Sequence, residues 1–214
     1  MLAIPVLNCT DAETANAEIR KAAEFLPAGG WIHIDVSDGK FTETATWGHP
    51  SDLPPIKKLY PQLHFEVHLM VQDPENLIAG WMEAGADRIV IQFEAMKDPG
   101  FMLDIARNYG KEIMLGLIPS TPVENLILYL SSFTSFQVLS VMPGPSGQKF
   151  IPGMESKVRF LQKYRPTALI EVDGGIVPEI CSMLKDAGAD AVTAATYIFG
   201  DPDPRQAYER LTNS

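Results

Sequence analysis

The sequence predicts an α/β protein, a closed (β/α)8 barrel of the TIM type. Strand-like and helix-like segments alternate along all 214 residues, and eight such pairs can be counted. Alternation of this kind indicates a parallel sheet, and eight units favour a closed barrel, for which this length is near the lower limit. The alternative is an open doubly wound sheet, but its G-x-G-x-x-G fingerprint is absent after the first strand. No linker, repeat or low-complexity segment interrupts the pattern, so we expect a single barrel domain over residues 1–214.

The expected strands are short runs rich in apolar and β-branched residues. The second strand begins at Trp31, and the Asp38-Gly39 turn breaks it. The other expected strands span residues 3–7, 64–71, 88–93, 111–118, 136–142, 168–172 and 191–194.

The expected helices carry recognisable start and stop residues. Thr10 or Asp11 is a candidate N-cap for the first helix, and Gly85 and Gly188 follow the ends of two others. The expected helices span residues 11–25, 51–60, 74–84, 100–108, 122–130, 154–164, 178–187 and 204–211.

Composition narrows the classes of function. Apolar residues make up 46% of the chain and charged residues 21%, a balance typical of globular proteins. A net charge of −10 argues against a nucleic-acid partner or an anionic membrane surface. Cys9 and Cys181 form no disulfide framework, and no apolar stretch is long enough to span a bilayer. The first seven residues are too short for a signal peptide, so we expect a cytoplasmic protein.

Four acidic or imidazole side chains stand at expected strand ends. Side chains on a strand alternate faces, so His33 and Asp35 point the same way. His68 lies toward the carboxyl end of the third strand, and Asp173 follows the seventh. Because the chemistry of a barrel lies at the carboxyl ends of its strands, we expect these four side chains to converge. Two imidazoles and two carboxylates suit a divalent transition metal, and Zn²⁺, Fe²⁺, Mn²⁺ and Co²⁺ all remain open.

Several motifs make the chain resemble the ribulose-phosphate 3-epimerase family over almost its full length. The order of VHLMV, PGxxGQKF and VDGG is specific, whereas the AGAD motif occurs in many phosphate-binding barrels. The resemblance rests on six segments, HIDVSDG at 33–39, VHLMV at 67–71, AGAD at 84–87 and 187–190, PGPSGQKF at 143–150 and VDGG at 172–175.

The resemblance implies one divalent metal ion held by His33, Asp35, His68 and Asp173. It also implies that Asp35 and Asp173 are the acid–base pair. Epimerisation at carbon 3 of a ketose phosphate removes a proton next to the carbonyl and returns it on the other face of an enediolate. A carboxylate is needed on each face, and a metal ion stabilises the negative charge that develops. The resemblance further suggests a homo-oligomer.

A phosphate on the substrate requires hydrogen-bond donors. Glycines after the seventh strand free the backbone for close approach, and the loops after strands seven and eight form the usual phosphate site of a barrel. Residues 144–148 are a candidate lid. The candidate substrate- and phosphate-binding residues are Cys9, Gly144, Ser146, Gly147, Gly174, Gly175, Ala195 and Thr196.

The substrate-facing rim departs from the family pattern. Where this chain has Cys9, Ser37, Thr44 and Gln92, the family usually has Ser, Met, Asn and His, and where it has Lys40 the family often has His. In the candidate lid the family has Phe and Gly at the positions of Pro145 and Ser146. After the eighth strand it has Gly-Ser at the positions of Ala195 and Thr196. The expected substrate is therefore a sugar phosphate, first D-ribulose 5-phosphate, with a hexulose 6-phosphate such as allulose 6-phosphate as the alternative. A non-catalytic sugar-phosphate-binding barrel is a third possibility. Related decarboxylases and synthases carry D-x-K-x-x-D, and this chain has no lysine between Asp35 and Asp38.

Overall fold

The strands form a closed parallel barrel. The computed structural model describes residues 1–214, and its eight strands follow one another around the barrel in chain order. Helices alternate with the strands along the chain. The predicted fold class is confirmed.

Two compact units make up the chain, residues 5–113 and residues 1–4 together with 114–214. The first strand crosses from one unit to the other. The expectation of a single domain over residues 1–214 stays a prediction, and the two units are described in turn.

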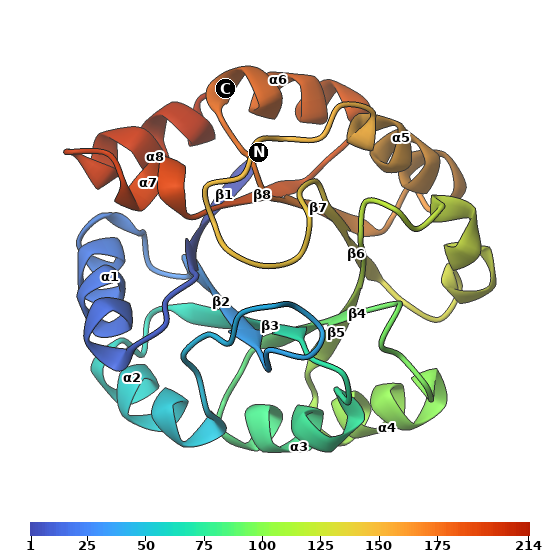
Figure 1. Ribbon diagram of the computed structural model, residues 1–214, viewed down its shortest axis with the longest axis horizontal. Coiled ribbons are helices and arrows are strands. Elements are labelled where there is room, and N and C mark those ends of the chain that lie inside the picture. Colours follow the sequence, from blue (N-terminus) through green and yellow to red (C-terminus); the bar gives the residue numbers. More distant parts are fainter. The chain divides into compact units, whose positions relative to one another are not determined.

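In the unit of residues 5–113, the helices α3 and α4 pack side by side outside β3 and β4 (Figure 1). Its strands are the end of β1 (Leu2–Leu7), β2 (Trp31–Ser37), β3 (His64–Met70) and β4 (Arg88–Gln92). Its helices are α1 (Ala12–Phe25), the 3₁₀ turn η1 (Pro50–Asp52), α2 (Leu53–Leu59), α3 (Glu75–Glu83) and α4 (Pro99–Tyr109).

The pairing of β2 with β3 sets the register of the polar side chains in this unit. His33 lies opposite Glu66, and Asp35 lies opposite His68. Ile32 and Ile34, which alternate with them, are fully buried. A slip of one residue would exchange the two faces, so this apolar alternation fixes which face of the strand carries the polar groups.

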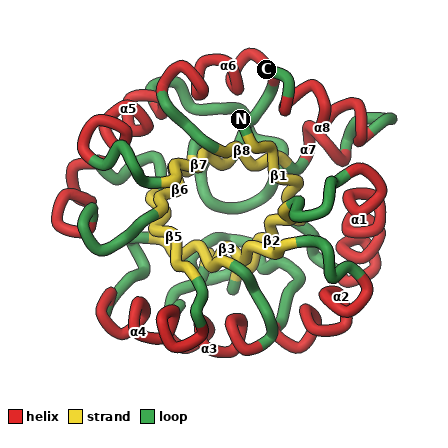
Figure 2. Tube along the Cα trace, turned by 180° about the vertical axis from the view of Figure 1, so that it is seen from behind, coloured by secondary structure: helices red, strands yellow, loops and turns green.

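In the other unit, α5 and α6 are neighbouring helices outside β6 and β7 (Figure 2). Its strands are β5 (Glu112–Leu117, from Met114 on), β6 (Ser135–Leu139), β7 (Leu169–Asp173) and β8 (Ala191–Ala194). Its helices are η2 (Val123–Tyr129), α5 (Met154–Tyr164), α6 (Pro178–Ala187), α7 (Thr196–Phe199) and α8 (Pro204–Thr212).

The structure corrects two of the expected elements and adds a short helix. The expected helix at 122–130 is a 3₁₀ helix, in which Asn125 N donates to Pro122 O at 3.1 Å. The strand expected over 136–142 ends at Leu139, the last residue in register with β7, and the amide of Ser140 makes the final bond of this ladder, to the carbonyl of Asp173 at 2.7 Å. The short helix α7 was not expected.

The two AGAD motifs have a structural role. Oδ2 of Asp87 accepts a hydrogen bond from Phe65 N at 2.9 Å, and Oδ2 of Asp190 accepts one from Ile170 N at 2.9 Å. Each aspartate precedes one strand and ties it to the beginning of the strand before it. Groups at this end of a barrel serve stability, so the repeated motif is part of the framework.

Candidate active site

Three of the four expected ligands meet in the unit of residues 5–113. Oδ1 of Asp35 lies 3.2 Å from His33 Nε2 and 3.0 Å from His68 Nδ1. Both imidazoles are fully buried, and Asp35 is 6% exposed. The ligand atoms of the three residues all lie within 4.8 Å of one another. Two imidazole nitrogens and a carboxylate oxygen suit a divalent transition metal, so these side chains fit such an ion.

Buried partners orient the His33 imidazole through its Nδ1 atom. Its Nδ1 lies 2.6 Å from Glu66 Oε1, and the other oxygen of Glu66 accepts a hydrogen bond from Arg88 Nε. The guanidinium of Arg88 in turn lies 4.5 Å from the centre of the Trp31 ring. A carboxylate on the far nitrogen of a histidine fixes its tautomer and raises its basicity as a ligand. Nε2 of His33 is therefore the atom presented to an ion.

The charges of this cluster stabilise one another. Burial would raise the pKa of Asp35, but hydrogen bonds from His33 and His68 hold it below its usual range. Burial would lower the pKa of His33, but Asp35 and Glu66 raise it well above its usual value. Burial also opposes ionisation of Glu66, whereas Arg88 and His33 lower its pKa to about 2. Because the ligating nitrogen must be unprotonated, an ion bound here would displace a proton from Nε2 of His33 and leave the one on Nδ1.

Two amide side chains, those of Asn8 and Gln92, contact the cluster. The sequence did not single out either of them as a site residue. Asn8 Nδ2 donates to Oδ2 of Asp35 at 2.7 Å, on the oxygen that does not face the imidazoles. Gln92 Nε2 lies 2.6 Å from His68 Nε2. Gln92 had been noted only as a departure from the family's histidine. The position of Asn8 directly after β1 is the one signal that could have identified it.

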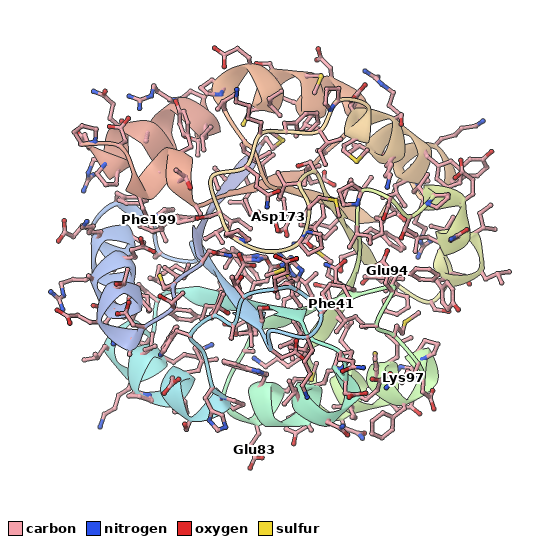
Figure 3. The ribbon with its side chains drawn as sticks, viewed as in Figure 1. Phe41, Glu83, Glu94, Lys97, Asp173 and Phe199 are labelled. Carbon is pink, nitrogen blue, oxygen red and sulfur yellow. The ribbon has the colours of Figure 1, made fainter.

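Asp173 lies in the other unit, at the carboxyl end of β7. It is 8% exposed, and Thr193 Oγ1 on β8 donates a hydrogen bond to its Oδ1. Its carbonyl accepts hydrogen bonds from both the amide and the hydroxyl of Ser140. Figure 3 shows Asp173 at the inner edge of its unit, whereas Phe199 on α7 lies farther out. The strand end thus carries a carboxylate in a fixed orientation.

The loop after β6 crosses the turn that follows Asp173. A Cβ atom on Gly175 would collide with the backbone of Phe150, including its Cα at 2.6 Å, and one on Gly174 would collide with the Val141 side chain. Only glycine allows this approach, and both glycines have positive φ, 107° at Gly174 and 66° at Gly175. The turn and the loop are therefore packed against each other through their backbones.

The remaining candidate phosphate residues of this unit lie in the same loops. A Cβ on Gly147 would be 3.7 Å from Thr196 Oγ1, so the loop after β6 approaches the start of α7. Ala195 is the N-cap residue of α7. Gly144 and Ser146 belong to the irregular segment that Gln148 closes by donating to the Met142 and Pro145 carbonyls at 2.8 and 3.0 Å.

Cys9 belongs to the unit of residues 5–113. Its thiol donates to Glu18 Oε2 at 3.2 Å. Burial, together with the nearby Glu18, raises the pKa of the thiol to about 12. The assignment of Cys9 to substrate binding stays a prediction.

One departure from the family pattern, Ser37, has a local explanation. The hydroxyl of Ser37 lies 2.5 Å from Thr42 Oγ1 and donates to the Thr44 carbonyl at 2.6 Å. These bonds close the loop after β2, which carries Phe41 (Figure 3). The hydroxyl of Ser37 therefore helps to shape this loop.

Fold and side chains together define a class of protein, a (β/α)8 barrel with a buried histidine–aspartate cluster that could bind a metal ion. Residues 4–199 match the model of the ribulose-phosphate 3 epimerase family. The chain belongs to this family, and it is an isomerase of the epimerase type.

Individual relatives agree with this assignment. Ribulose-phosphate 3-epimerase from Chlamydia muridarum is 37% identical over 78% of this chain and 75% of its own. The enzyme of the same name from Schizosaccharomyces pombe is 33% identical over 94% and 88%. Among solved structures, a 3-hexulose-6-phosphate synthase superposes with a TM-score of 0.74 over 100% of this chain and 99% of its own. At 18% identity that likeness concerns the fold alone.

No helix of the structure combines the length and the apolar character that crossing a membrane requires.

Proposed function

We propose that this protein epimerises carbon 3 of a ketose phosphate, converting D-ribulose 5-phosphate to D-xylulose 5-phosphate. The observation that carries the proposal is the buried set of His33, Asp35 and His68, held within 4.8 Å of one another in a chain of the epimerase family. Opposed carboxylates are needed to move a proton between the two faces of an enediolate. Asp35 and Asp173 are the residues to which we assign this task.

The proposed cofactor is one divalent ion, Zn²⁺, Fe²⁺, Mn²⁺ or Co²⁺. His33 Nε2, Asp35 Oδ1 and His68 Nδ1 would hold it, with a carboxylate oxygen of Asp173 as the fourth ligand. When bound, the ion supplies Lewis-acid stabilisation of the negative charge that develops on the substrate oxygens. Glu66 and Gln92 orient the two imidazoles from behind.

The two carboxylates carry the proton transfers. One aspartate removes the carbon 3 proton and the other, protonated, returns a proton on the opposite face; the direction of reaction decides which does which. Asn8 holds Asp35 by its Oδ2, and Thr193 holds Asp173 by its Oδ1. A neutral donor orients each carboxylate without adding a positive charge, which would lower the basicity of the carboxylate.

The phosphate would be bound by hydrogen-bond donors close to it. The overall electrostatic field of the protein would not attract an anion, because the chain carries a net charge of −10. The tight packing of Gly174 and Gly175 against the loop after β6 places backbone amides and small side chains in one region. Charge-assisted hydrogen bonds contribute roughly 1.5–3 kcal/mol each. The residues proposed for substrate and phosphate binding are Cys9, Gly144, Ser146, Gly147, Gly174, Gly175, Ala195 and Thr196.

A cytoplasmic location and a homo-oligomeric assembly belong to the same proposal. The two cysteines are free and buried, in keeping with a reducing compartment. The family resemblance supports the assembly.

The deciding experiment measures exchange of the carbon 3 proton in deuterated water, together with epimerisation, for a panel of ketoses. The panel contains ribulose 5-phosphate, allulose 6-phosphate and the two free sugars. We expect the highest kcat/KM with ribulose 5-phosphate and a loss of orders of magnitude without the phosphate, because remote binding energy positions carbon 3. A preference for allulose 6-phosphate would show that the substrate is the hexulose phosphate instead. Absence of exchange with every ketose in the metal-loaded protein would show that the protein binds sugar phosphates without catalysing epimerisation.

A further inference from the structure

The carboxyl end of β4 carries a buried side-chain amide, that of Gln92, whose oxygen has no hydrogen-bond partner. Gln92 is the last residue of β4 and is fully buried. Its Nε2 lies 2.6 Å from His68 Nε2, while its Oε1 is buried and has no hydrogen-bond partner. A buried acceptor without a partner is unfavourable, so its persistence next to a proposed ligand histidine calls for an explanation.

The contact between the two nitrogens restricts the proton on His68. An amide nitrogen can only donate, so His68 Nε2 is the acceptor in this arrangement. The imidazole proton is then on Nδ1, which lies 3.0 Å from Oδ1 of Asp35 and donates to it. A protonated Nδ1 cannot ligate a metal ion.

A half-turn of the Gln92 amide reverses this situation. Oxygen and nitrogen exchange places, and Oε1 then accepts a hydrogen bond from a proton on His68 Nε2. The unsatisfied oxygen gains a partner, and Nδ1 presents a lone pair on the side of Asp35. A glutamine can serve both tautomers because its amide contains a donor and an acceptor, whereas an apolar side chain of the same length can serve neither.

We infer that Gln92 is a positioning residue for the metal ligand His68, and that its amide turns over when an ion binds. Outer partners of ligating histidines fix the tautomer and typically change metal affinity 10- to 100-fold. This inference rests on the proposed metal site. It goes beyond the ligand set, because it assigns to a residue of β4 control over which nitrogen of His68 is available.

The test compares two variants of Gln92 with a matched packing control. Gln92→Met keeps the length of the side chain and removes both hydrogen-bonding groups, whereas Gln92→Glu retains an acceptor. Val90→Ala is the control, since Val90 is fully buried on the same face of β4 and pairs in register with His68. Zn²⁺ affinity is measured by competition with a chelator, after thermal unfolding has shown that each variant is folded.

We expect Gln92→Met to bind Zn²⁺ at least tenfold more weakly than wild type, and Gln92→Glu and Val90→Ala to stay within about threefold or to bind more tightly. Nitrogen-15 NMR of the His68 ring supplies a readout independent of activity. In the wild-type protein the proton should move from Nδ1 to Nε2 when Zn²⁺ is added.

Several results would overturn the inference. They are wild-type affinity in Gln92→Met, equal weakening in Val90→Ala, weakening in folded Gln92→Glu, or a proton that is already on Nε2 before Zn²⁺ is added. A wild-type protein that binds no Zn²⁺ at all would overturn the proposed metal site as well, so the two failures can be told apart.

Discussion

Asn8 and Asp35 are joined by a hydrogen bond of 2.7 Å between Asn8 Nδ2 and Asp35 Oδ2. Oδ1 of the same carboxylate faces His33 and His68. The two oxygens of Asp35 therefore have different surroundings, one among imidazoles and one under a neutral amide. This division leaves the carboxylate a defined orientation for both roles that we propose for it.

Removing the amide of Asn8 should impair turnover more than binding. In Asn8→Ala we expect kcat to fall about 10-fold or more, because the Asp35 carboxylate is then free to rotate, and small displacements of a catalytic group are costly. KM should change by less than about threefold. Steady-state kinetics decide this, with Asn16→Ala as the control, since the Asn16 side chain only donates to the Ala12 carbonyl on the exposed side of α1. A fall in kcat/KM due to KM alone would count against an orienting role.

Replacing either proposed base should abolish turnover in both directions. Asp35→Asn and Asp173→Asn should each lower kcat by roughly 100-fold or more, because one carboxylate cannot serve both faces of the intermediate. Zn²⁺ content is measured in parallel, since both residues are also proposed ligands. Glu83→Gln, on the outer face of α3 (Figure 3), should behave as wild type. Retention of more than about a tenth of wild-type kcat in either variant would refute the two-base scheme.

A methyl group on Gly175 should displace the loop after β6. Gly175→Ala places Cβ against the Phe150 backbone, so we expect KM for the phosphorylated ketose to rise at least tenfold and the melting temperature to fall. Gly29→Ala is the matched control, because Gly29 also has positive φ, 79°, but a Cβ there meets nothing within 4 Å. Both variants bear the backbone penalty of about 1–2 kcal/mol. Equal KM values for the two would show that the contact of the loop with Gly175 does not shape the substrate site.

The Asp87 carboxylate should stabilise the fold in a pH-dependent manner. It accepts hydrogen bonds from Lys57 Nζ at 2.6 Å and Lys111 Nζ at 3.1 Å, besides the Phe65 amide. Burial would raise the pKa of Asp87, but these donors hold it below its usual value. Since the pKa in the folded state is the lower one, the stabilisation is present above the unfolded-state value of about 3.9 and is lost as pH falls through the folded value.

Asp87→Asn should therefore lower the free energy of unfolding at pH 7 by about 1–3 kcal/mol. The difference from wild type should shrink as pH falls below about 4. Urea unfolding at a series of pH values measures both effects. Asp104→Asn is the control, because Asp104 forms an exposed pair with Arg107, and such pairs contribute about 0–1 kcal/mol. A deficit in Asp87→Asn that stays constant down to pH 2 would contradict the assignment.

The sequence by itself determined the barrel and the identity of its central residues. Alternating β-branched residues and helix caps are local signals, which is why Asp11 caps α1 as expected and the bounds of α5, α6 and β8 agree with the prediction. The alternation of Ile32 and Ile34 with His33 and Asp35 is enough to predict that His33 and Asp35 share one face of β2. The distinctive order of motifs identified the family.

Only the tertiary structure decided which side chains support the site. Asn8 contacts Asp35 across 27 residues of sequence, Gln92 contacts His68 across 24, and Thr193 contacts Asp173 across 20. None of these pairs has a local pattern, because each depends on the register between two successive strands that are separated by a helix and its loops. The early end of β6 is likewise set by how far its register with β7 extends, to Leu139 and Asp173, which side-chain periodicity does not encode. Hydrogen bonds between strands form only after the barrel has brought the strands together, and for this reason the supporting residues could be identified only from the folded structure.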